Sequence, residues 1–194
     1  MTKEIIAFQG EKGAYSHLAC EEIFPQAIIK TCATFEETFK LASEDENAKI
    51  VIPIENSLAG RVADIHYLLT KYKLQIYSEH FQNVEHNLLV KEGTELKDIK
   101  YVRSHVQAID QCQKIISKNK FKTIISADTA GSAKDLSKSS DKSIGAIASR
   151  LSAKIYDLKI LMKNIEDETQ NTTRFVIMSK NVSQPELVAP KYQI

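Results

Sequence analysis

Residues 5–24 read IIAFQGEKGAYSHLACEEIF, and this stretch sets the fold class. Its apolar, β-rich start over 5–8 predicts a buried strand, and the spacing of apolar residues over 15–24 predicts a helix. A glycine turn lies between them. The same order of strand and helix recurs at 49–54 with 62–69, 100–103 with 106–116, 121–126 with a helix from Thr129, and 143–147 with 148–156. This alternation is typical of an α/β fold with parallel strands.

One interval interrupts the alternation. Residues 74–81 and 84–90 read as two extended segments with no helix between them. Because 194 residues are enough for two small domains, we expect a hinge here and a second lobe after it. The last strand is expected at 174–178. After Lys180 the periodicity is lost and two prolines appear, as in linkers, and the sequence leaves open whether the chain is naturally short or was cut before a further domain.

The composition argues against several classes of protein. With 43% hydrophobic and 26% charged residues and a net charge of +1, the chain has no field that would attract nucleic acid or an anionic membrane. Its N-terminal apolar run is too short for a signal peptide or membrane span. The three cysteines form no C-x-x-C pair, so we expect reduced thiols, a cytoplasmic location and no metal site. For the five histidines we expect surface or capping roles.

Two polar motifs follow strands in the first half of the chain. The turn at 10–16, GEKGAYS, offers free N–H groups at a helix start, where an anion is favoured, although a plain turn would use its glycines equally well. Glu55, Asn56 and Ser57 follow a buried strand, the place where ligands bind in open α/β sheets. The competing interpretation is that Asn56 or Ser57 caps the next helix.

In the second half of the chain, polar residues again follow the predicted strands. Ser104 with Gln107 fits a capping box, as does Thr34 with Glu37 earlier in the chain. Gln107 is therefore either a cap or a site residue, while Gln111 lies one turn further on the same face. The small residues that follow Asp128, at 129–133, would let a carboxylate approach a helix start, and the alternative is that Asp128 is a plain N-cap.

The last strand opens with Asn171-Thr172-Thr173-Arg174-Phe175. A hydroxyl beside a guanidinium suits a carboxylic substrate. In a regular strand, however, Thr173 and Arg174 point to opposite faces, so only one of them can face a given pocket. An exposed arginine on a β-rich edge is the competing interpretation.

Together these motifs resemble one family. In order and spacing, the chain is similar to prephenate dehydratases over residues 5 to about 180. The resemblance is carried by GxxGAYS at 10–16, PIENS at 53–57, NLL at 87–89, SH at 104–105, DTAGSA at 128–133, GAIAS at 145–149 and TRF at 173–175. The combination of ENS with TRF is its specific part. Val106 departs from the family, which usually has proline there, and this weakens the placement of Ser104 and Gln107.

The resemblance implies a fold and a reaction. The fold would be two α/β lobes of the periplasmic-binding-protein type II architecture, with the active site in the interlobe cleft and the last strand returning to the first lobe. The first lobe would span 1–79 plus 173–181, the second 80–172, and 182–194 would form a linker-like tail too short for the family's ACT-type regulatory domain. The reaction would be the decarboxylating dehydration of prephenate to phenylpyruvate, without a cofactor, in a homo-oligomer, with a dimer favoured.

The resemblance also assigns residue roles. Thr173 matches the threonine near the leaving hydroxyl, and because an aliphatic hydroxyl is a very weak acid, we expect a hydrogen-bond donor, with Glu55 a candidate proton source. The expected catalytic residues are Thr173, Glu55, Asn56, Ser104 and Gln111. The expected substrate-binding residues are Gly13, Ala14, Tyr15, Ser16, Ser57, Gln107, Thr129, Ala130, Gly131, Asn171, Arg174 and Phe175.

Two other functions stay open. An arogenate dehydratase would act on a substrate with an amino group in place of the keto group, a difference that motifs of this length do not resolve. A non-catalytic two-lobed receptor for small carboxylates would need a cleft, but would have no reason to combine Glu55 with Thr173.

Overall fold

The first lobe folds around one mixed sheet. A computed structural model describes residues 4–62 and 65–181. The first sheet has the strand order β2-β1-β3-β11-β5, and β4 pairs with β3. The elements of this first lobe are β1 (Ile5–Gln9), α1 (Tyr15–Ile23), β2 (Ile28–Cys32), α2 (Phe35–Glu44), β3 (Ala48–Asn56), β4 (Gly60–Arg61), α3 (His66–Tyr72), β5 (Gln75–Asn83) and β11 (Thr172–Ser179).

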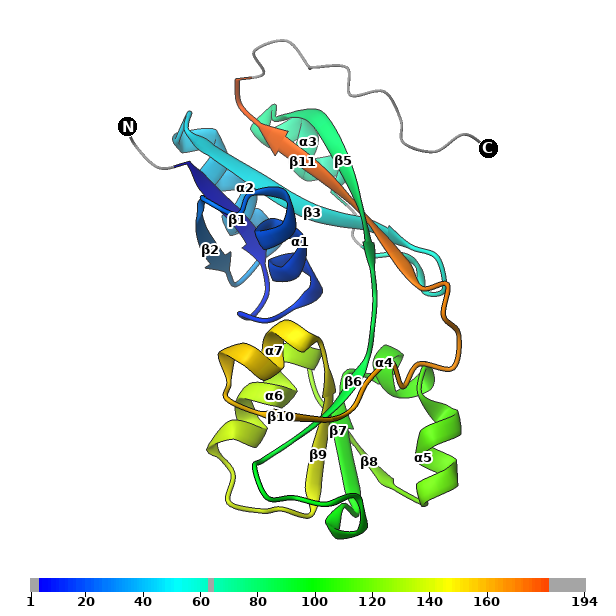
Figure 1. Cartoon of the computed structure of the whole chain (residues 1–194). Helices are drawn as coiled ribbons and strands as arrows, with labels where there is room; N and C mark the ends of the chain where they lie inside the picture. Colours follow the sequence, from blue (N-terminus) through cyan, green and yellow to red (C-terminus); the bar gives the residue numbers. More distant parts are fainter. Residues whose placement is uncertain (1–3, 63–64, 182–194) are drawn as a thin grey trace.

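A second sheet, ordered β10-β6-β9-β7-β8, forms the second lobe. The chain crosses between lobes twice, from β5 into β6 and from β10 back to β11, as Figure 1 shows. The elements of the second lobe are β6 (Asn87–Val90), η1 (Leu96–Asp98), β7 (Tyr101–Ser104), α4 (Val106–Asp110), α5 (Gln113–Asn119), β8 (Lys122–Ile125), α6 (Thr129–Lys138), β9 (Ile144–Ala148), α7 (Arg150–Ile155) and β10 (Lys159–Met162).

The strand directions confirm the predicted two-lobed α/β fold. β1 pairs in parallel with β2 and β3, and β7 pairs in parallel with β8 and β9. The strands next to the crossings, β5, β6, β10 and β11, are antiparallel to their neighbours. β5 stays in the first sheet through Asn83 and β11 joins it at Thr172. The expected boundaries at 79/80 and 172/173 stay predictions, and the expected tail at 182–194 lies outside the described residues.

The sequence prediction missed three strands, which are the two-residue β4 and the edge strands β2 and β10. β2 is an edge strand whose residues are mostly exposed, and β10 is a short edge strand that pairs only with β6. A strand at a sheet edge needs only one buried face, so the apolar signal in such a short segment is weak. Both edge strands therefore become visible only through their pairing partners.

The helix expected over 106–116 is broken at Gln111. The carbonyl of Gln111 accepts a hydrogen bond of 2.7 Å from the backbone N–H of Asp167. The Asp167 carboxylate in turn accepts from the N–H of Lys114, 3.0 Å away, in the first turn of α5. The chain returning to the first lobe thus takes the place of the intrahelical bonds, and this contact is not encoded in the local sequence.

One capping prediction is confirmed in part and the other is wrong. Thr34 Oγ1 accepts from the N–H of Glu37 at 3.0 Å, while the Glu37 carboxylate accepts from the N–H of Ala33 and not from that of Thr34. At α4 the N-cap is His105, whose Nδ1 accepts from Gln107 N–H at 3.3 Å. Ser104 instead donates to a carbonyl across the sheet, as described below.

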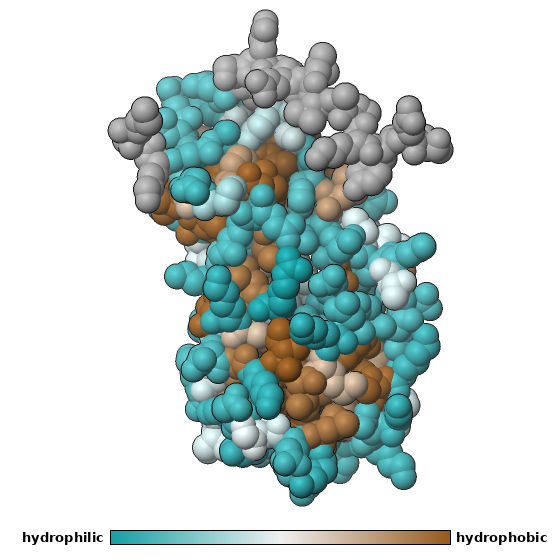
Figure 2. All heavy atoms as spheres, viewed as in Figure 1, coloured by the Kyte–Doolittle hydropathy of each residue, from teal (hydrophilic) through white to brown (hydrophobic). Residues whose placement is uncertain are grey.

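Each lobe has its own core. On β3, Ile50 and Ile52 pack with Phe39 on one face of the sheet, and Val51 packs with Phe175 on the other, all of them at most 1% exposed. The second lobe likewise has two clusters of buried apolar residues. Polar residues cover most of the face seen in Figure 2. Over residues 4–62 and 65–181, the structure has no helix of the length and apolar character that a membrane crossing requires.

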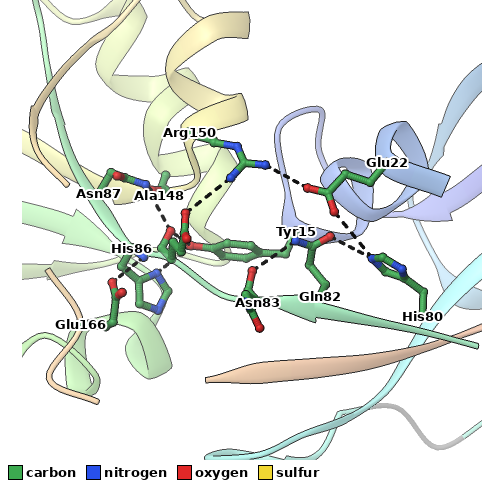
Figure 3. A network of polar contacts seen from close by, with 11 residues as sticks. Tyr15, Glu22, His80, Gln82, Asn83, His86, Asn87, Ala148, Arg150 and Glu166 are labelled. Atoms are coloured by element: carbon green, nitrogen blue, oxygen red, sulfur yellow. Dashed lines mark hydrogen bonds and ion pairs between the residues drawn. The ribbon is translucent and has the colours of Figure 1, made fainter. Parts of the chain in front are cut away.

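The lobes meet at the turn before α1. The carbonyl oxygen of Gly13 accepts hydrogen bonds from Ser149 Oγ at 2.5 Å and from Ser152 Oγ at 2.9 Å, both in the second lobe. On another part of the interface, Arg150 bonds to Glu22 of α1 at 2.9 Å, as Figure 3 shows. Gly13 has a positive φ of 92°, and a Cβ there would lie 2.9 Å from Ser152 Cα. Only glycine fits this contact.

We expect Gly13→Ala to lower the free energy of unfolding by about 2–4 kcal/mol, because it adds a clash with Ser152 to the strain of a positive φ. Gly60→Ala is the matched control, since Gly60 also has a positive φ of 76° but no atom within 4 Å of its Cβ position. That control should cost only about 1–2 kcal/mol. Urea unfolding measures both changes, and equal costs would contradict the proposed contact.

Candidate active site

A cavity of about 940 Å³ lies between the lobes. In the first lobe it is bordered by residues at the carboxyl ends of β1, β2 and β3, and in the second lobe by residues that follow β7 and β8. This is where open α/β sheets bind ligands. The expected site residues that line the cavity are Ala14, Tyr15, Ser16, Asn56, Gln107, Gln111, Thr129, Thr173 and Phe175. Those that do not line it are Gly13, Glu55, Ser57, Ser104, Ala130, Gly131, Asn171 and Arg174.

The central contact of the site joins Asn56 and Thr173. The two residues are opposite each other in the β3–β11 pairing, and Asn56 Nδ2 donates to Thr173 Oγ1 at 2.9 Å. Asn56 Oδ1 accepts from the backbone N–H groups of Leu58 at 3.0 Å and Ala59 at 2.8 Å. These two donors fix which end of the amide faces Thr173. The Thr173 oxygen therefore acts as an acceptor, and its own hydrogen has no acceptor among the described residues.

From Asn56 a line of hydrogen bonds leads into the second lobe. Asn56 Nδ2 also donates to Asn171 Oδ1 at 2.7 Å, and Asn171 Nδ2 donates to Gln111 Oε1 at 2.9 Å. Gln111 Oε1 also lies 2.8 Å from His86 Nε2, and His86 Nδ1 lies 2.8 Å from the Tyr15 hydroxyl. The last of these contacts is seen in Figure 3. Asn171 is 1% exposed and does not line the cavity itself, but it is hydrogen-bonded to Asn56 and Gln111, which do.

The two aromatic members of this line are uncharged. Burial raises the pKa of the Tyr15 hydroxyl well above its ordinary value of 10.0, and electrostatic interactions with Cys112, Glu166 and Glu85 add to this. Burial also lowers the pKa of His86 below its ordinary value of 6.5, against smaller opposite effects of Gln111 and Glu166. Both groups therefore stay neutral near pH 7.

Thr173 and Arg174 lie on opposite faces of the sheet, as the sequence predicted. Arg174 is paired in the ladder with Glu55, which is exposed and outside the cavity. The Arg174 guanidinium bonds to Glu79 of β5 through Nε at 2.8 Å, and so neither holds Glu55 nor faces the cavity. The expectations that Arg174 binds substrate and that Glu55 passes a proton to Thr173 do not fit this geometry.

The two expected serines have structural contacts. Ser104 is fully buried, and its Oγ donates to the Ile147 carbonyl of β9 at 2.6 Å. Ser57 Oγ donates to the Gln170 carbonyl at 3.0 Å and accepts from the Thr172 N–H at 3.0 Å. Ser57 thus ties the end of β3 to the segment that returns from the second lobe. Neither side chain is placed to touch a molecule in the cavity.

Two helix starts border the cavity, and they differ. Asp128 caps α6, since its Oδ1 accepts from the Gly131 N–H at 2.6 Å, which confirms the plain N-cap interpretation. A Cβ on Gly131 would lie 2.7 Å from the Asp128 carboxylate, so this glycine serves the cap. α1 has Ala14 at its N-cap position and no side-chain cap. The first N–H groups of α1 are therefore the better place for an anion.

His86 and Arg61 are among the lining residues that the sequence analysis did not assign to the site. His86 was expected on the surface or in a cap, yet it is 2% exposed and joins Tyr15 to Gln111. Its only sequence signal was its position just before the NLL motif. Arg61, at the end of β4, also lines the cavity, and its guanidinium lies 2.7 Å from His66 Nε2. Among the described lining residues it is the one lysine or arginine.

Comparison with known proteins gives one consistent family. The sequence model of the family described as prephenate dehydratase matches residues 6–183. The bifunctional N-acyl-homoserine lactone acylase/prephenate dehydratase of Komagataeibacter europaeus is 42% identical to this chain, over 92% of this chain and 63% of that protein. Arogenate dehydratase/prephenate dehydratase 1 of Arabidopsis thaliana is 39% identical, over 97% of this chain and 48% of that protein.

The fold agrees with these sequence matches. The crystal structure of a prephenate dehydratase from Arthrobacter aurescens, in complex with L-Phe, superposes with a TM-score of 0.85 at 26% identity, covering 94% of this chain and 62% of that chain. The chain thus spans roughly half to two thirds of the length of the proteins that it matches.

Because His86 is buried and neutral, we expect the free energy of unfolding to depend on pH. When the pH falls below about 6.5, the unfolded state gains a proton on this residue before the folded state does, so the free energy of unfolding falls. One histidine contributes at most about 1.4 kcal/mol per pH unit. Urea unfolding of His86→Gln should therefore show a smaller loss between about pH 7.5 and about pH 5.5 than the parent chain shows. Equal losses in the two proteins would rule out a depressed pKa for His86.

Proposed function

Because the chain belongs to the prephenate dehydratase family, we propose that it converts prephenate to phenylpyruvate, a carbon–oxygen lyase reaction of phenylalanine biosynthesis. The observation that carries this proposal is the pairing of Asn56 with Thr173 at 2.9 Å. It leaves one hydroxyl hydrogen, at the wall of an interlobe cavity, without an acceptor in the part of the chain that the structure describes. A donor held in this way suits a departing oxygen.

The proposed reaction consumes one proton. The bond from the ring to its carboxyl group breaks and releases carbon dioxide, and the electron pair moves through the ring as it becomes aromatic. The bond to the ring hydroxyl then breaks, and the departing oxygen takes a proton and leaves as water. Aromatisation supplies the driving force, so the protein must mainly hold the dianion, stabilise the departing oxygen and exclude water.

In this scheme Thr173 donates a hydrogen bond that strengthens as negative charge develops on the departing oxygen. The substrate carboxylates would meet the uncapped start of α1, the free amide nitrogen of Gln111 and the guanidinium of Arg61. Gln107 and Thr129 border the same cavity from the second lobe. Glu55 is left out of the scheme because it lies on the other face of the sheet.

Arogenate is the alternative substrate, since relatives such as the Arabidopsis thaliana protein are named for both acids. The Komagataeibacter europaeus relative is named for an acylase activity as well. Incubating the chain separately with prephenate, arogenate and an N-acyl-homoserine lactone, and following each product, separates these activities. Tight binding of prephenate without turnover would instead favour the carboxylate receptor.

We propose that the protein is a homodimer and that it is located in the cytoplasm. The support for a dimer is the outer edge of β5, where Ile76 is 52% and Phe81 is 48% exposed. Exposed apolar residues on an edge strand favour pairing with another chain. Sedimentation equilibrium measures the mass directly.

Removing the Thr173 hydroxyl should remove most of the activity. Thr173→Val keeps the shape of the side chain and is expected to lower kcat by about 10²-fold or more, because the departing oxygen loses its donor. Thr173→Ser should retain far more of the activity, since serine keeps the hydroxyl.

Thr172→Val is the matched control for this test. Thr172 Oγ1 donates to Asn83 Oδ1 at 3.2 Å, so its hydrogen is used within the sheet. We expect kcat within about threefold of the parent value for this variant. A similar loss in Thr172→Val and Thr173→Val, or a near-normal rate in the latter, would contradict the proposed role of Thr173.

A further inference from the structure

Six polar side chains form one continuous line of hydrogen bonds through the site. The line joins both lobes and both chain crossings, and every contact in it is 2.9 Å or shorter. Its members are Tyr15, His86, Gln111, Asn171, Asn56 and Thr173. The proposed reaction uses only part of this line, which leaves the role of His86 to be explained.

The direction of each bond follows from the two backbone donors on Asn56 Oδ1. Because that oxygen faces Leu58 and Ala59, the Asn56 nitrogen must face Asn171, and the atom of Asn171 that accepts is its oxygen. The Asn171 nitrogen then faces Gln111, so the atom of Gln111 in this contact is its oxygen. An amide oxygen accepts only.

This direction determines where the hydrogen of His86 lies. Gln111 Oε1 carries no hydrogen, so His86 Nε2, at 2.8 Å, must be the donor. The neutral ring then has a lone pair on Nδ1, 2.8 Å from the Tyr15 hydroxyl, and the single hydrogen of that hydroxyl is shared between Nδ1 and the Glu85 carbonyl oxygen at 2.9 Å. Both ring nitrogens are engaged within the protein, so His86 has neither a proton nor a lone pair to offer a substrate.

We propose that His86 is a positioning residue, which with its hydrogen on Nε2 holds the oxygen of Gln111 toward Asn171 and the Gln111 amide nitrogen toward the cavity. This inference rests on the proposed function. Gln111 Nε2 has no partner among the described residues, and Gln111 lines the cavity, so its two N–H groups are available to an anionic substrate. Without the donor on His86, the Gln111 oxygen keeps only the N–H of Asn171, so one hydrogen bond instead of two holds the amide with its nitrogen toward the cavity.

Two substitutions of His86 test the roles of its two ring nitrogens separately. The amide nitrogen of Gln reaches the position of Nε2, and that of Asn reaches the position of Nδ1. His86→Gln therefore keeps a donor for Gln111 and loses the contact with Tyr15, while His86→Asn does the reverse. We expect His86→Asn to lower kcat/KM for prephenate by about tenfold or more, and His86→Gln to stay within about threefold of the parent.

Thermal unfolding of both variants is the control for a general loss of packing. If His86 only filled space, the activity of the two variants would follow their Tm values, and Gln would give no rescue. Equal activity in the two variants, or better activity in His86→Asn, would overturn the proposal.

A second measurement does not depend on the substrate. Long-range ¹H–¹⁵N spectra of the parent chain labelled at histidine show which ring nitrogen carries the hydrogen. We expect the Nε2–H form for His86 near pH 7, assigned by its loss in His86→Gln. A hydrogen on Nδ1, or a charged ring, would overturn the proposal even in a chain that turns over prephenate. If the parent chain is inactive with prephenate, the proposed function fails while the spectra still decide the tautomer.

Discussion

The pairing of β11 between β3 and β5 is the constraint on which the site depends. β11 arrives from the second lobe, and its alignment places Thr173 opposite Asn56 on one side and opposite Gln82 on the other. A shift of one residue would turn Arg174 toward the cavity and Thr173 toward Glu79. The hydrogen bonds of Ser57 with the returning chain, at 3.0 Å, help to hold this alignment. The chemistry of the cavity is thus set by the register of a strand.

Alternating apolar runs were enough to predict the α/β class, the two lobes and the strands that pack on both faces. They failed for β2 and β10, because an edge strand is stabilised by its neighbour more than by its own pattern. They also failed at Gln111, where the helix stops because Asp167, from a distant part of the chain, occupies its carbonyl. Contacts between segments far apart in sequence leave no local periodic signal.

For the candidate site, too, the sequence predicted some residues correctly and failed for others. Residues whose place follows from strand ends, such as Asn56, Thr173 and Thr129, line the cavity as expected. Ser104 and Gly131 sit in recognisable motifs, but their contacts serve the sheet and the α6 cap. His86 could not be found from pattern, since its role comes from neighbours contributed by both lobes. A sequence motif therefore predicts the location of the site more reliably than the role of each side chain in it.

The contact of Gly13 with the second lobe bears on how the cavity opens. The Gly13 carbonyl is held by the hydroxyls of Ser149 and Ser152, and water can replace both donors when the lobes separate. Exchange of such bonds with water changes the free energy by only about 1 kcal/mol each. These two bonds therefore add little to the cost of separating the lobes. The ion pairs of Arg150 with Glu22 and of Lys134 with Glu11 would have to break as well. The interface is thus held by several weak contacts, each of which water can replace.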